Sequence, residues 1–387
     1  MKVLHLFSNA KYTGPAEPAL NLVVSLRKLG VEADLAFPNL PAGTQHTLLE
    51  TARDRGVEPI LAFRLNKHRN PVANFFDSQA LTRHLKTTPY DLVHCHLEND
   101  HRIAAGPAGR LGIPLVRSNY DGTGLQKPAR QGPLLMRTAR LLEPSRIALE
   151  HDAETYGYPR ESMQVVPGAV DVERFDPSRE VPDGRRWLGI GPQAFVVGIV
   201  ARMQLHRRYE DFFHAIRRLV DAGCDAHAIV VGRGTNQARV GWQPVETLGL
   251  SDRVHFPGYV AGENYVGMVK AFSTKVFLVP GSDGTCRAVR EAMAMGKPAV
   301  VADRGMLSEI VDDRVNGFVF DGSANGLFEA LHALQADRQR LFEMGRAART
   351  KAVEQFSLEV QARTVRQLYN EVLDSRAATQ DVGNANG

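Results

Sequence analysis

The chain has little cysteine and no long apolar run, and both absences exclude classes of protein. Its three cysteines, Cys95, Cys224 and Cys286, form no Cys-x-x-Cys pair among 387 residues, so neither a disulfide framework nor a structural zinc site is expected. No stretch approaches the roughly 18 apolar residues of a membrane-spanning helix. The apolar start of the chain breaks at Ser8 and Asn9, which predicts a strand and not a secretory signal. We therefore expect a cytoplasmic protein.

Two further absences concern ligands. The sequence has no run of lysine and arginine with interleaved aromatic residues, which argues against a nucleic-acid partner. It also has no Asp-x-Asp pair, and His94 and His96 share one strand face without a third ligand, His101 included, at a familiar metal-site spacing. We expect no metal and no cofactor, with a histidine metal site as the weaker alternative. The net charge of +4 still allows anionic partners.

The sequence does contain two successive series of strand and helix patterns. Apolar residues make up 43% of the chain and charged residues 23%, the balance of a globular protein long enough for two domains. Short apolar runs alternate with helix patterns over 1–170 and again over 192–356, which predicts parallel sheets built from βαβ units. The stretch 171–191 is rich in proline, glycine and charge, and we interpret it as a linker.

The end of the chain and the fold class complete this division. A helix is predicted over 357–374, and the small polar residues of 375–387 are typical of a disordered tail. The expected fold class is α/β, with two doubly wound, Rossmann-like domains. Ligands of such sheets bind beyond the carboxyl ends of the strands, so two such edges facing each other would form a cleft for two substrates.

The segment 281–291 has the clearest chemical pattern. A strand pattern ends at Pro280, a glycine-flanked loop follows, and a helix pattern begins. Backbone amides at a helix N-terminus favour anions, and a carboxylate two turns along the helix can accept hydrogen bonds from a ribose. This predicts a diphosphate site with donor ligands at Gly284, Thr285, Cys286 and Glu291.

A simpler interpretation of the same segment stays open. Asp283 or Thr285 would then only cap the helix, and Arg287 and Glu291 would form an ion pair on its surface. A second loop, at 201–208, is cationic and carries Arg202 and Arg207 after a predicted strand. Arginine binds phosphate in a bidentate manner, although a solvated basic loop is the alternative here too.

Together these segments resemble the signature of glycosyltransferase family 4, the retaining group 1 enzymes of GT-B fold. Asp283 and Glu291 have the spacing of the family's Glu-x7-Glu pattern, and Gly296, Lys297 and Pro298 continue it. The loop at 201–208 is similar to Gly-Arg-x4-Lys-Gly, with Ala201 and Arg208 at the two glycines. Two more segments resemble family patterns and supply Gly232, Gly234, Gly258 and Tyr259.

The resemblance implies a fold and a set of roles. The fold would be GT-B, with two facing domains and a C-terminal helix that can cross back to the first. Catalytic roles would fall to Arg202 and Arg207, which neutralise the leaving diphosphate, and to Asp283, which contacts the donor sugar. Glu291 would hold the ribose. Asp283 is one methylene shorter than the family's glutamate, which changes its reach to the sugar.

The first domain resembles the family less. Gly14 precedes Pro15 where a Gly-Gly pair is usual, in a loop near the acceptor and the donor phosphates, and proline removes one N–H there. His96 is the strand-end histidine that borders the cleft. Many relatives have a histidine after the next strand, but Asn119 or Tyr120 stands at that position here. With Asp121, they are candidates for acceptor or sugar contacts.

The implied function is a retaining, metal-independent transfer of a hexose from a UDP- or GDP-linked donor to a hydroxyl group. The acceptor would be a surface glycan or a lipid-linked sugar. The alternatives are a nucleotide-sugar epimerase or phosphorylase of the same fold, and a non-catalytic sugar-nucleotide binding protein. Leucines and arginines alternate over 127–146, and Arg64, Lys67, His68 and Arg69 form a basic loop. This pattern is typical of peripheral contact with anionic lipid at the inner face of a membrane, or of a core helix with a solvated face.

Overall fold

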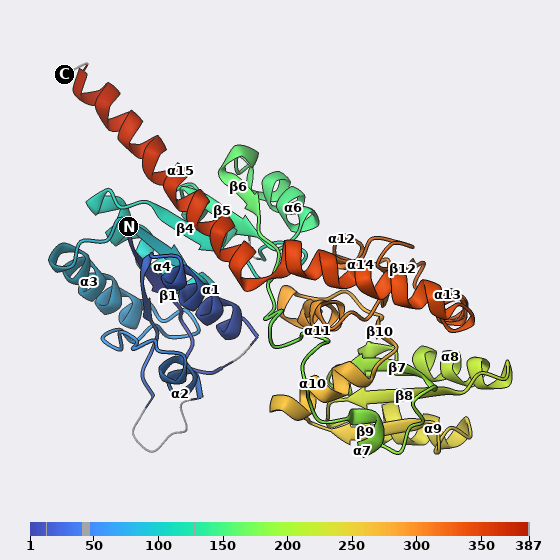
Figure 1. The fold of residues 1–387 in the computed structure, drawn as a ribbon. Helices are drawn as coiled ribbons and strands as arrows, with labels where there is room; N and C mark the ends of the chain where they lie inside the picture. Colours follow the sequence, from blue (N-terminus) through green and yellow to red (C-terminus); the bar gives the residue numbers. More distant parts are fainter. Residues whose placement is uncertain (13, 41–46, 127, 386–387) are drawn as a thin grey trace. The chain divides into compact units, whose positions relative to one another are not determined.

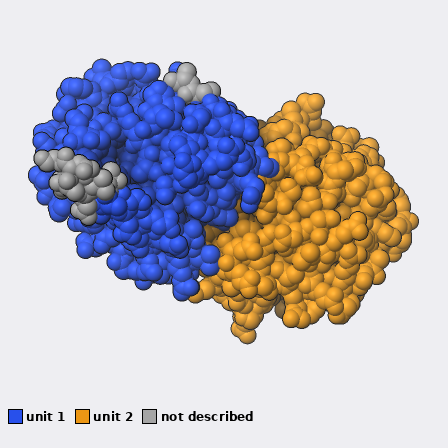
Figure 2. Space-filling view, turned by 90° about the horizontal axis from the view of Figure 1, so that it is seen from above, with its two compact units in different colours: residues 1–168, 358–387 blue, residues 169–357 orange. Residues whose placement is uncertain are grey.

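The computed structural model describes residues 1–12, 14–40, 47–126 and 128–385. The chain forms two compact units: unit 1 comprises Met1–Gly168 and Leu358–Gly387, and unit 2 comprises Ala169–Ser357 (Figure 2). Among the described residues, no helix has both the length and the apolar character needed to cross a bilayer. All three cysteines are buried, and none of them forms a disulfide.

Unit 1 is a six-stranded parallel sheet with helices on its faces (Figure 1). The strand order is β2-β1-β3-β4-β5-β6. Strands β1, β3 and β4 are almost wholly buried, as expected where both faces of a parallel sheet are covered. Its elements are β1 Lys2–Leu6, α1 Ala16–Lys28, β2 Glu32–Ala36, α2 Thr47–Asp54, α3 Pro71–Thr87, β3 Leu92–Cys95, α4 Glu98–Leu111, β4 Leu115–Ser118, α5 Pro128–Leu135, β5 Arg140–Glu143, α6 Arg146–Tyr156, β6 Met163–Val165 and α15 Leu358–Ala385.

Unit 2 has the same plan, with the strand order β12-β11-β10-β7-β8-β9 and all strands parallel. The predicted α/β class with two Rossmann-like sheets is therefore confirmed. Its elements are α7 Gly184–Trp187, β7 Phe195–Val200, α8 Tyr209–Asp221, β8 Ala226–Val231, α9 Gln243–Thr247, β9 Val254–Gly258, α10 Gly262–Ala271, β10 Thr274–Phe277, α11 Asp283–Ala294, β11 Ala299–Ala302, α12 Leu307–Ile310, β12 Gly317–Phe320, α13 Ala324–Ala336 and α14 Arg338–Phe356.

Each sheet has one topological switch point. In unit 1 the chain passes from β1 to β2 on one side and then continues with β3 on the other side of β1. In unit 2 the strands β8 and β9 follow β7 on one side, and β10 lies on the other. Ligands of doubly wound sheets bind where the strand order reverses, beyond the carboxyl ends of the strands. The loops after β1, β3, β7 and β10 are therefore the places to look for a site.

The segment 171–191 is not a free linker. It belongs to unit 2, where α7 packs against α10. A Cβ atom on Gly184 would lie 2.8 Å from the carbonyl oxygen of Gly267, so only glycine fits there. Arg185 donates hydrogen bonds to the carbonyl oxygens of Ala271 and Ala194. Gly184 in this segment thus serves close packing against the unit.

The C-terminal helix belongs to unit 1, as the resemblance allowed. α15 packs against α1, and Ala362, Val365 and Tyr369 on α15 are completely buried in the core of unit 1. The helix continues to Ala385, so the prediction of a disordered tail from 375 was wrong up to that residue. A helix that is already nucleated gains one hydrogen bond for each residue it adds, and polar composition alone does not stop it.

Candidate functional site

The loop after β7 places two arginines at the switch point of unit 2. Arg202 is exposed and Arg207 is partly buried in a short 3₁₀ turn. The Nε atom of Arg207 is buried without a hydrogen-bond partner among the described residues. An unsatisfied buried donor costs free energy, which an anion bound at this loop would recover.

Arg208 explains how the loop holds this shape. Its backbone has a φ of 58°, in the left-handed region that favours glycine. The side chain compensates by donating to Asp211 Oδ2 at 2.5 Å and to the carbonyl oxygen of Gly322 at 2.6 Å. The family pattern has glycine at this position, and the backbone conformation gives the physical reason.

The helix α11 begins directly after the loop that follows β10. Ser282 precedes its first turn and makes no capping hydrogen bond with its side chain. The Cys286 amide donates to the carbonyl oxygen of Ser282 at 3.0 Å, so this predicted phosphate ligand is committed to the helix and was wrong as an amide donor. The amides of Gly284 and Thr285 lie in the first turn, whose N–H groups have no partner within a helix. The side chains of Asp283 and Thr285 lie outside the described part of the structure.

Glu291 is buried two turns into α11, with 5% of its surface exposed. Tyr265 of α10 donates its hydroxyl to Glu291 Oε2 at 2.5 Å, and Arg287 Nε lies 3.2 Å from Oε1. Burial, with the nearby Glu291 carboxylate, raises the pKa of Tyr265 well above its usual value, so the phenol keeps its proton. Arg287 and Glu291 therefore do form the ion pair that the simpler interpretation predicted. The Glu291 carboxylate, however, is buried and does not lie on the helix surface. Tyr265 was not predicted, because it lies on another helix.

The predicted glycines of unit 2 serve the packing of backbone on backbone. A Cβ atom on Gly232 would lie 2.1 Å from the carbonyl oxygen of Ala201, and one on Gly234 would lie 2.3 Å from that of Met203. The loop after β8 thus lies directly on the loop after β7. Gly258 adopts a φ of +76° and accepts a hydrogen bond from the Gly232 amide. Tyr259 beside it is 70% exposed.

Lys275 is a buried cation in β10 that the sequence analysis did not single out. It has no exposed surface, and its Nζ donates to the carbonyl oxygen of Val276 at 2.6 Å. Burial, with a smaller contribution from Arg207, lowers its pKa to about 7 against the opposing effect of Glu291. The available signal was a lysine inside an otherwise apolar strand run.

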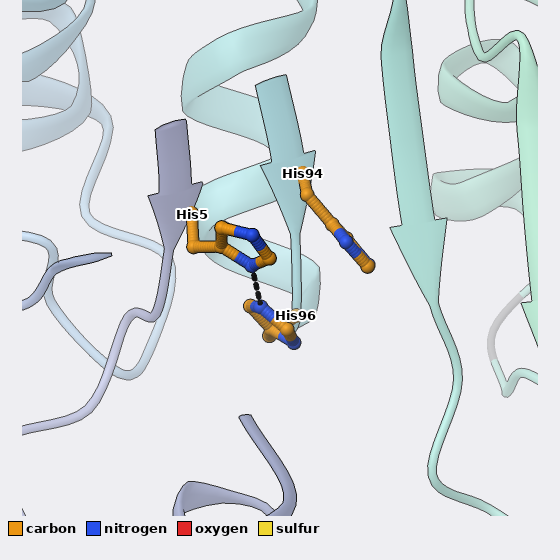
Figure 3. A group of neighbouring side chains, drawn as sticks. All are labelled: His5, His94 and His96. Carbon is orange, nitrogen blue, oxygen red and sulfur yellow. Dashed lines mark hydrogen bonds between the residues drawn. The ribbon is translucent and has the colours of Figure 1, made fainter. Parts of the chain in front are cut away.

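At the switch point of unit 1, three histidines lie together with no exposed surface (Figure 3). His5 comes from β1, and His94 and His96 come from β3 and its end. His5 Nδ1 and His96 Nε2 are 3.0 Å apart, and the rings of His94 and His96 stack with centroids 4.5 Å apart. His5 was missed, although it is the one polar residue in the first apolar run.

Hydroxyl groups surround this cluster and decide what it can bind. His94 Nδ1 lies 2.5 Å from the Tyr369 hydroxyl of α15, and its Nε2 lies 2.8 Å from Ser118 Oγ. His96 Nδ1 lies 2.7 Å from the Tyr120 hydroxyl. One nitrogen of each of the three histidines lies within 4.8 Å of the others, a spacing that a metal ion could bridge. Both nitrogens of His94 and of His96 already have partners, so a metal would have to displace them. His101, the other histidine of that sequence segment, lies apart from the cluster, with its Nε2 at 2.8 Å from Thr138 Oγ1.

Two of the predicted acceptor residues shape the loop after β4. Asn119 Nδ2 donates to Glu143 Oε2 at 2.8 Å, and the Asp121 amide donates to Asn119 Oδ1 at 3.0 Å. Asp121 Oδ1 accepts from the amide and the hydroxyl of Thr123. Burial and the neighbouring Asp152 raise the pKa of Glu143 well above its usual value. Asn119 and Asp121 therefore position Tyr120, which stands between them.

Gly14 lies in the loop after β1, close in sequence to the start of α1. It is exposed, and a Cβ atom there would meet nothing within 4 Å. Packing within unit 1 therefore does not require glycine at this position. A requirement for glycine would have to come from a ligand that approaches the backbone.

The sequence and the fold are both similar to those of known proteins. Two family models match in tandem, Glycosyltransferase Family 4 over residues 14–174 and Glycosyl transferases group 1 over residues 183–351. A D-inositol 3-phosphate glycosyltransferase from Nocardia farcinica is 27% identical over 294 residues, 70% of this chain and 64% of that protein. This chain thus spans less than two thirds of the length of that relative.

Two further proteins extend the comparison. The UDP-Gal:alpha-D-GlcNAc-diphosphoundecaprenol alpha-1,3-galactosyltransferase of Escherichia coli is 24% identical over 310 residues, 75% of this chain and 78% of that protein. The crystal structure of Anabaena HepE in complex with UDP has a TM-score of 0.76 at 19% identity, covering 96% of this chain and 100% of that one. The last comparison shows that the two chains share a fold.

Proposed function

The chain belongs to the group 1, family 4 glycosyltransferases, and from that premise we propose that it moves a hexose from a nucleoside diphosphate sugar to a hydroxyl group. The donor would be UDP- or GDP-linked, and the acceptor a surface glycan or a lipid-linked sugar. We further propose that the transfer retains the anomeric configuration and needs no metal. The Escherichia coli relative is named for a diphosphoundecaprenol-linked acceptor, which supports a lipid-linked acceptor for this chain.

The observation that carries this proposal is the arrangement at the β7/β10 switch point. The loop after β7 supplies Arg202 and the unsatisfied Nε of Arg207, and the loop after β10 supplies the first turn of α11. Guanidinium groups and a helix N-terminus both favour a diphosphate. Glu291 is buried two turns along α11, and in this proposal its carboxylate accepts hydrogen bonds from the ribose hydroxyls. In this proposal Asp283 contacts the sugar.

The proposed step needs charge stabilisation more than it needs a base. The bond from the anomeric carbon to the leaving phosphate oxygen breaks, a bond to the acceptor oxygen forms on the same face, and the leaving diphosphate takes the acceptor's proton. Arg202, Arg207 and the α11 amides would stabilise the charge that develops on the diphosphate. These groups occupy the role that a divalent cation has in metal-dependent transferases.

Transfer assays with UDP-, GDP- and ADP-sugars test the proposal. We expect transfer of the sugar to lipid-linked or oligosaccharide acceptors. NMR of the product should show the anomeric configuration of the donor, and the rate should be unchanged in EDTA. Free nucleotide release without an acceptor requirement would indicate an epimerase instead. Donor binding without turnover over a broad acceptor panel would indicate a binding protein. An inverted anomer or a loss of rate in EDTA would contradict the finer parts of the proposal.

We propose that unit 1 contacts anionic lipid, but through another surface than 127–146. Lys127 lies outside the described residues, and the rest of that stretch forms α5 and β5, with Leu135, Leu141 and Leu142 in the core. The favoured surface is instead α3, where Val72, Phe75 and Phe76 are 67%, 60% and 54% exposed.

Charge supports lipid as the partner of this α3 surface. The basic loop Arg64, Lys67, His68 and Arg69 directly precedes α3 and is exposed. The only acidic residue from 64 to 87 is Asp77, which is buried and accepts the amides of Arg64 and Leu65 at 2.9 Å. Exposed aromatic residues flanked only by cations are typical of surfaces that lie on anionic bilayers. An enzyme at the inner face of a membrane would use such a surface.

Vesicle flotation at physiological salt tests this surface. The protein should float with vesicles that contain phosphatidylglycerol and stay behind with pure phosphatidylcholine. The double variant Phe75→Ser, Phe76→Ser should lose most of the binding, whereas Phe342→Ser, which removes a 63% exposed phenylalanine from unit 2, should keep it. Equal flotation of the double variant and the wild-type protein would contradict the proposal.

A further inference from the structure

A hydrogen-bond chain runs from the interior of the unit 1 sheet to the loop after β4. His5 Nδ1 is 3.0 Å from His96 Nε2, and His96 Nδ1 is 2.7 Å from the Tyr120 hydroxyl. The Tyr120 ring also stacks on the His96 ring, at 16° and 6.1 Å between centroids. Both histidines are fully buried, whereas Tyr120 is only partly buried. The chain therefore connects the β1/β3 switch point to a residue that a ligand can reach.

The two distances indicate which groups donate. Hydroxyl donors make hydrogen bonds of about 2.7 Å, and N–H donors make bonds of about 3.0 Å. The distances fit an arrangement in which Tyr120 donates its O–H to His96 Nδ1 and His96 donates its Nε2–H to His5 Nδ1. His5 in turn carries its hydrogen on Nε2, which is buried without a hydrogen-bond partner among the described residues. The lone pairs of the Tyr120 oxygen are then oriented away from His96.

Burial keeps both histidines neutral. It lowers the pKa of His5 to about 3, with a smaller contribution from Arg27. It lowers the pKa of His96 well below the usual range, and the neighbouring His5 and Arg117 act in the same direction. A histidine in this environment is a poor base near neutral pH. His96 is therefore suited to orienting a neighbour and not to removing a proton.

We infer that Tyr120 orients the acceptor by accepting a hydrogen bond from the hydroxyl group that attacks the donor sugar, and that His96 and His5 are positioning residues for Tyr120. This inference rests on the proposed function, and it names the group in unit 1 that receives the acceptor. Tyr120 directly follows β4, at the carboxyl edge of the sheet where doubly wound folds bind ligands. The acceptor's proton leaves with the diphosphate, as proposed above, so the chain gains and loses no proton.

NMR of the histidine rings tests the chain without reference to activity. In protein labelled with nitrogen-15, signals that disappear in His5→Phe and in His96→Phe identify the two residues. Both rings should be Nε2–H tautomers and should not titrate between about pH 5 and pH 9, where an ordinary histidine titrates near 6.5. A proton on Nδ1 of either ring, or titration near 6.5, would overturn the chain. Zinc added to the wild-type protein should leave these signals unchanged, and joint shifts of His5, His94 and His96 would show a metal site instead.

Kinetics with the wild-type enzyme's acceptor test the role of Tyr120. Tyr120→Phe keeps the stacked ring and removes only the hydroxyl, so the acceptor KM should rise about tenfold, the value of roughly one hydrogen bond, while the donor KM stays constant. His5→Phe should also raise the acceptor KM, but by a smaller factor. Tyr90→Phe removes another largely buried hydroxyl of unit 1, bonded to Asp34, and should leave the acceptor KM unchanged.

The outcomes separate this inference from the proposed function. An unchanged acceptor KM in Tyr120→Phe would overturn the role of Tyr120. Wild-type protein that transfers no sugar to any acceptor would instead contradict the proposed function, and the tautomer measurement would still decide whether the hydrogen-bond chain exists.

Discussion

Both units have a six-stranded parallel sheet, but the electrostatics at their switch points differ. The loops after β7 and β10 bring an exposed Arg202, a partly buried Arg207 with an unsatisfied Nε and the start of α11 to one edge. The corresponding edge of unit 1 is built around His5 and His96, which burial keeps neutral. The first edge is suited to an anion, and the second to neutral hydroxyl groups.

This difference teaches how one fold can serve both substrates of a transfer reaction. The parallel sheet fixes where ligands bind, and the side chains that end its strands decide which chemistry they meet. A diphosphate requires cations and free amides. A sugar hydroxyl requires uncharged donors and acceptors in fixed positions. The predictions below test each half of this contrast, from the largest effect to the smallest.

The largest effect is expected at the buried carboxylate of unit 2. Glu291→Ala should lower nucleotide affinity by roughly a hundredfold or more, because two hydrogen bonds to a charged acceptor are worth about 1.5–3 kcal/mol each. Calorimetry with UDP and GDP measures this. Glu329→Ala, at an exposed position on α13, is the control. Unchanged affinity in Glu291→Ala would contradict the ribose contact and would mean that Glu291 serves only as a structural partner of Tyr265.

The cationic loop should matter nearly as much, but in turnover. Arg207→Ala should lower kcat by about a hundredfold, the typical cost of losing one group that stabilises developing charge. Steady-state rates at saturating donor measure this. Arg346→Ala, an exposed arginine on α14, should change little. A near-normal rate in Arg207→Ala would mean that the loop is only a solvated basic surface. The proposed contrast between the two sheet edges would then be wrong.

The glycines of unit 2 should affect stability and not binding chemistry. Gly232→Ala should lower the free energy of unfolding by about 2 kcal/mol or more, because its φ is +141° and its Cβ would overlap the Ala201 carbonyl oxygen. Gly191→Ala, with open space and an ordinary φ, should change it by less than about 0.5 kcal/mol. Urea unfolding followed by tryptophan fluorescence reports unit 2, which holds both tryptophans. Equal stability of the two variants would contradict the close approach.

The smallest effect concerns the neutral histidines of unit 1. The folded pKa of His5, about 3, lies below its unfolded value of about 6.5. Between these values the unfolded state binds more protons, so stability falls as the pH falls, by at most about 1.4 kcal/mol per pH unit for one histidine. His5→Phe should reduce this slope, measured by amide exchange in β1 at pH 7 and pH 5. Identical slopes would mean that the pKa of His5 is the same in the folded and the unfolded chain, which would contradict the shift.

The sequence predicted what depends on local periodicity and missed what depends on contacts between distant segments. The alternation of strand and helix patterns predicted both parallel sheets, because each strand or helix pattern spans only a few residues. The place of Glu291 two turns into a helix also follows from local spacing. Its partner Tyr265 lies 26 residues away on another helix, and no pattern in either segment indicates the bond between them.

Two other differences have physical causes that composition hides. The segment 171–191 looks like a linker because glycine and proline favour turns, but Gly184 is required where α7 meets the backbone of α10. The Cys286 amide looked available because it follows a glycine loop, but the helix had already begun at Asp283. A one-turn shift in a helix start decides which amides can bind an anion, and sequence places such starts only approximately.

A crystal structure with a bound nucleoside diphosphate tests the central claim most directly. Crystals soaked with UDP and, separately, with GDP should show the diphosphate against the Gly284 amide and the Arg207 guanidinium, with the ribose on Glu291. A diphosphate bound away from α11, or a ribose that does not contact Glu291, would contradict the assignment of the anion site to unit 2.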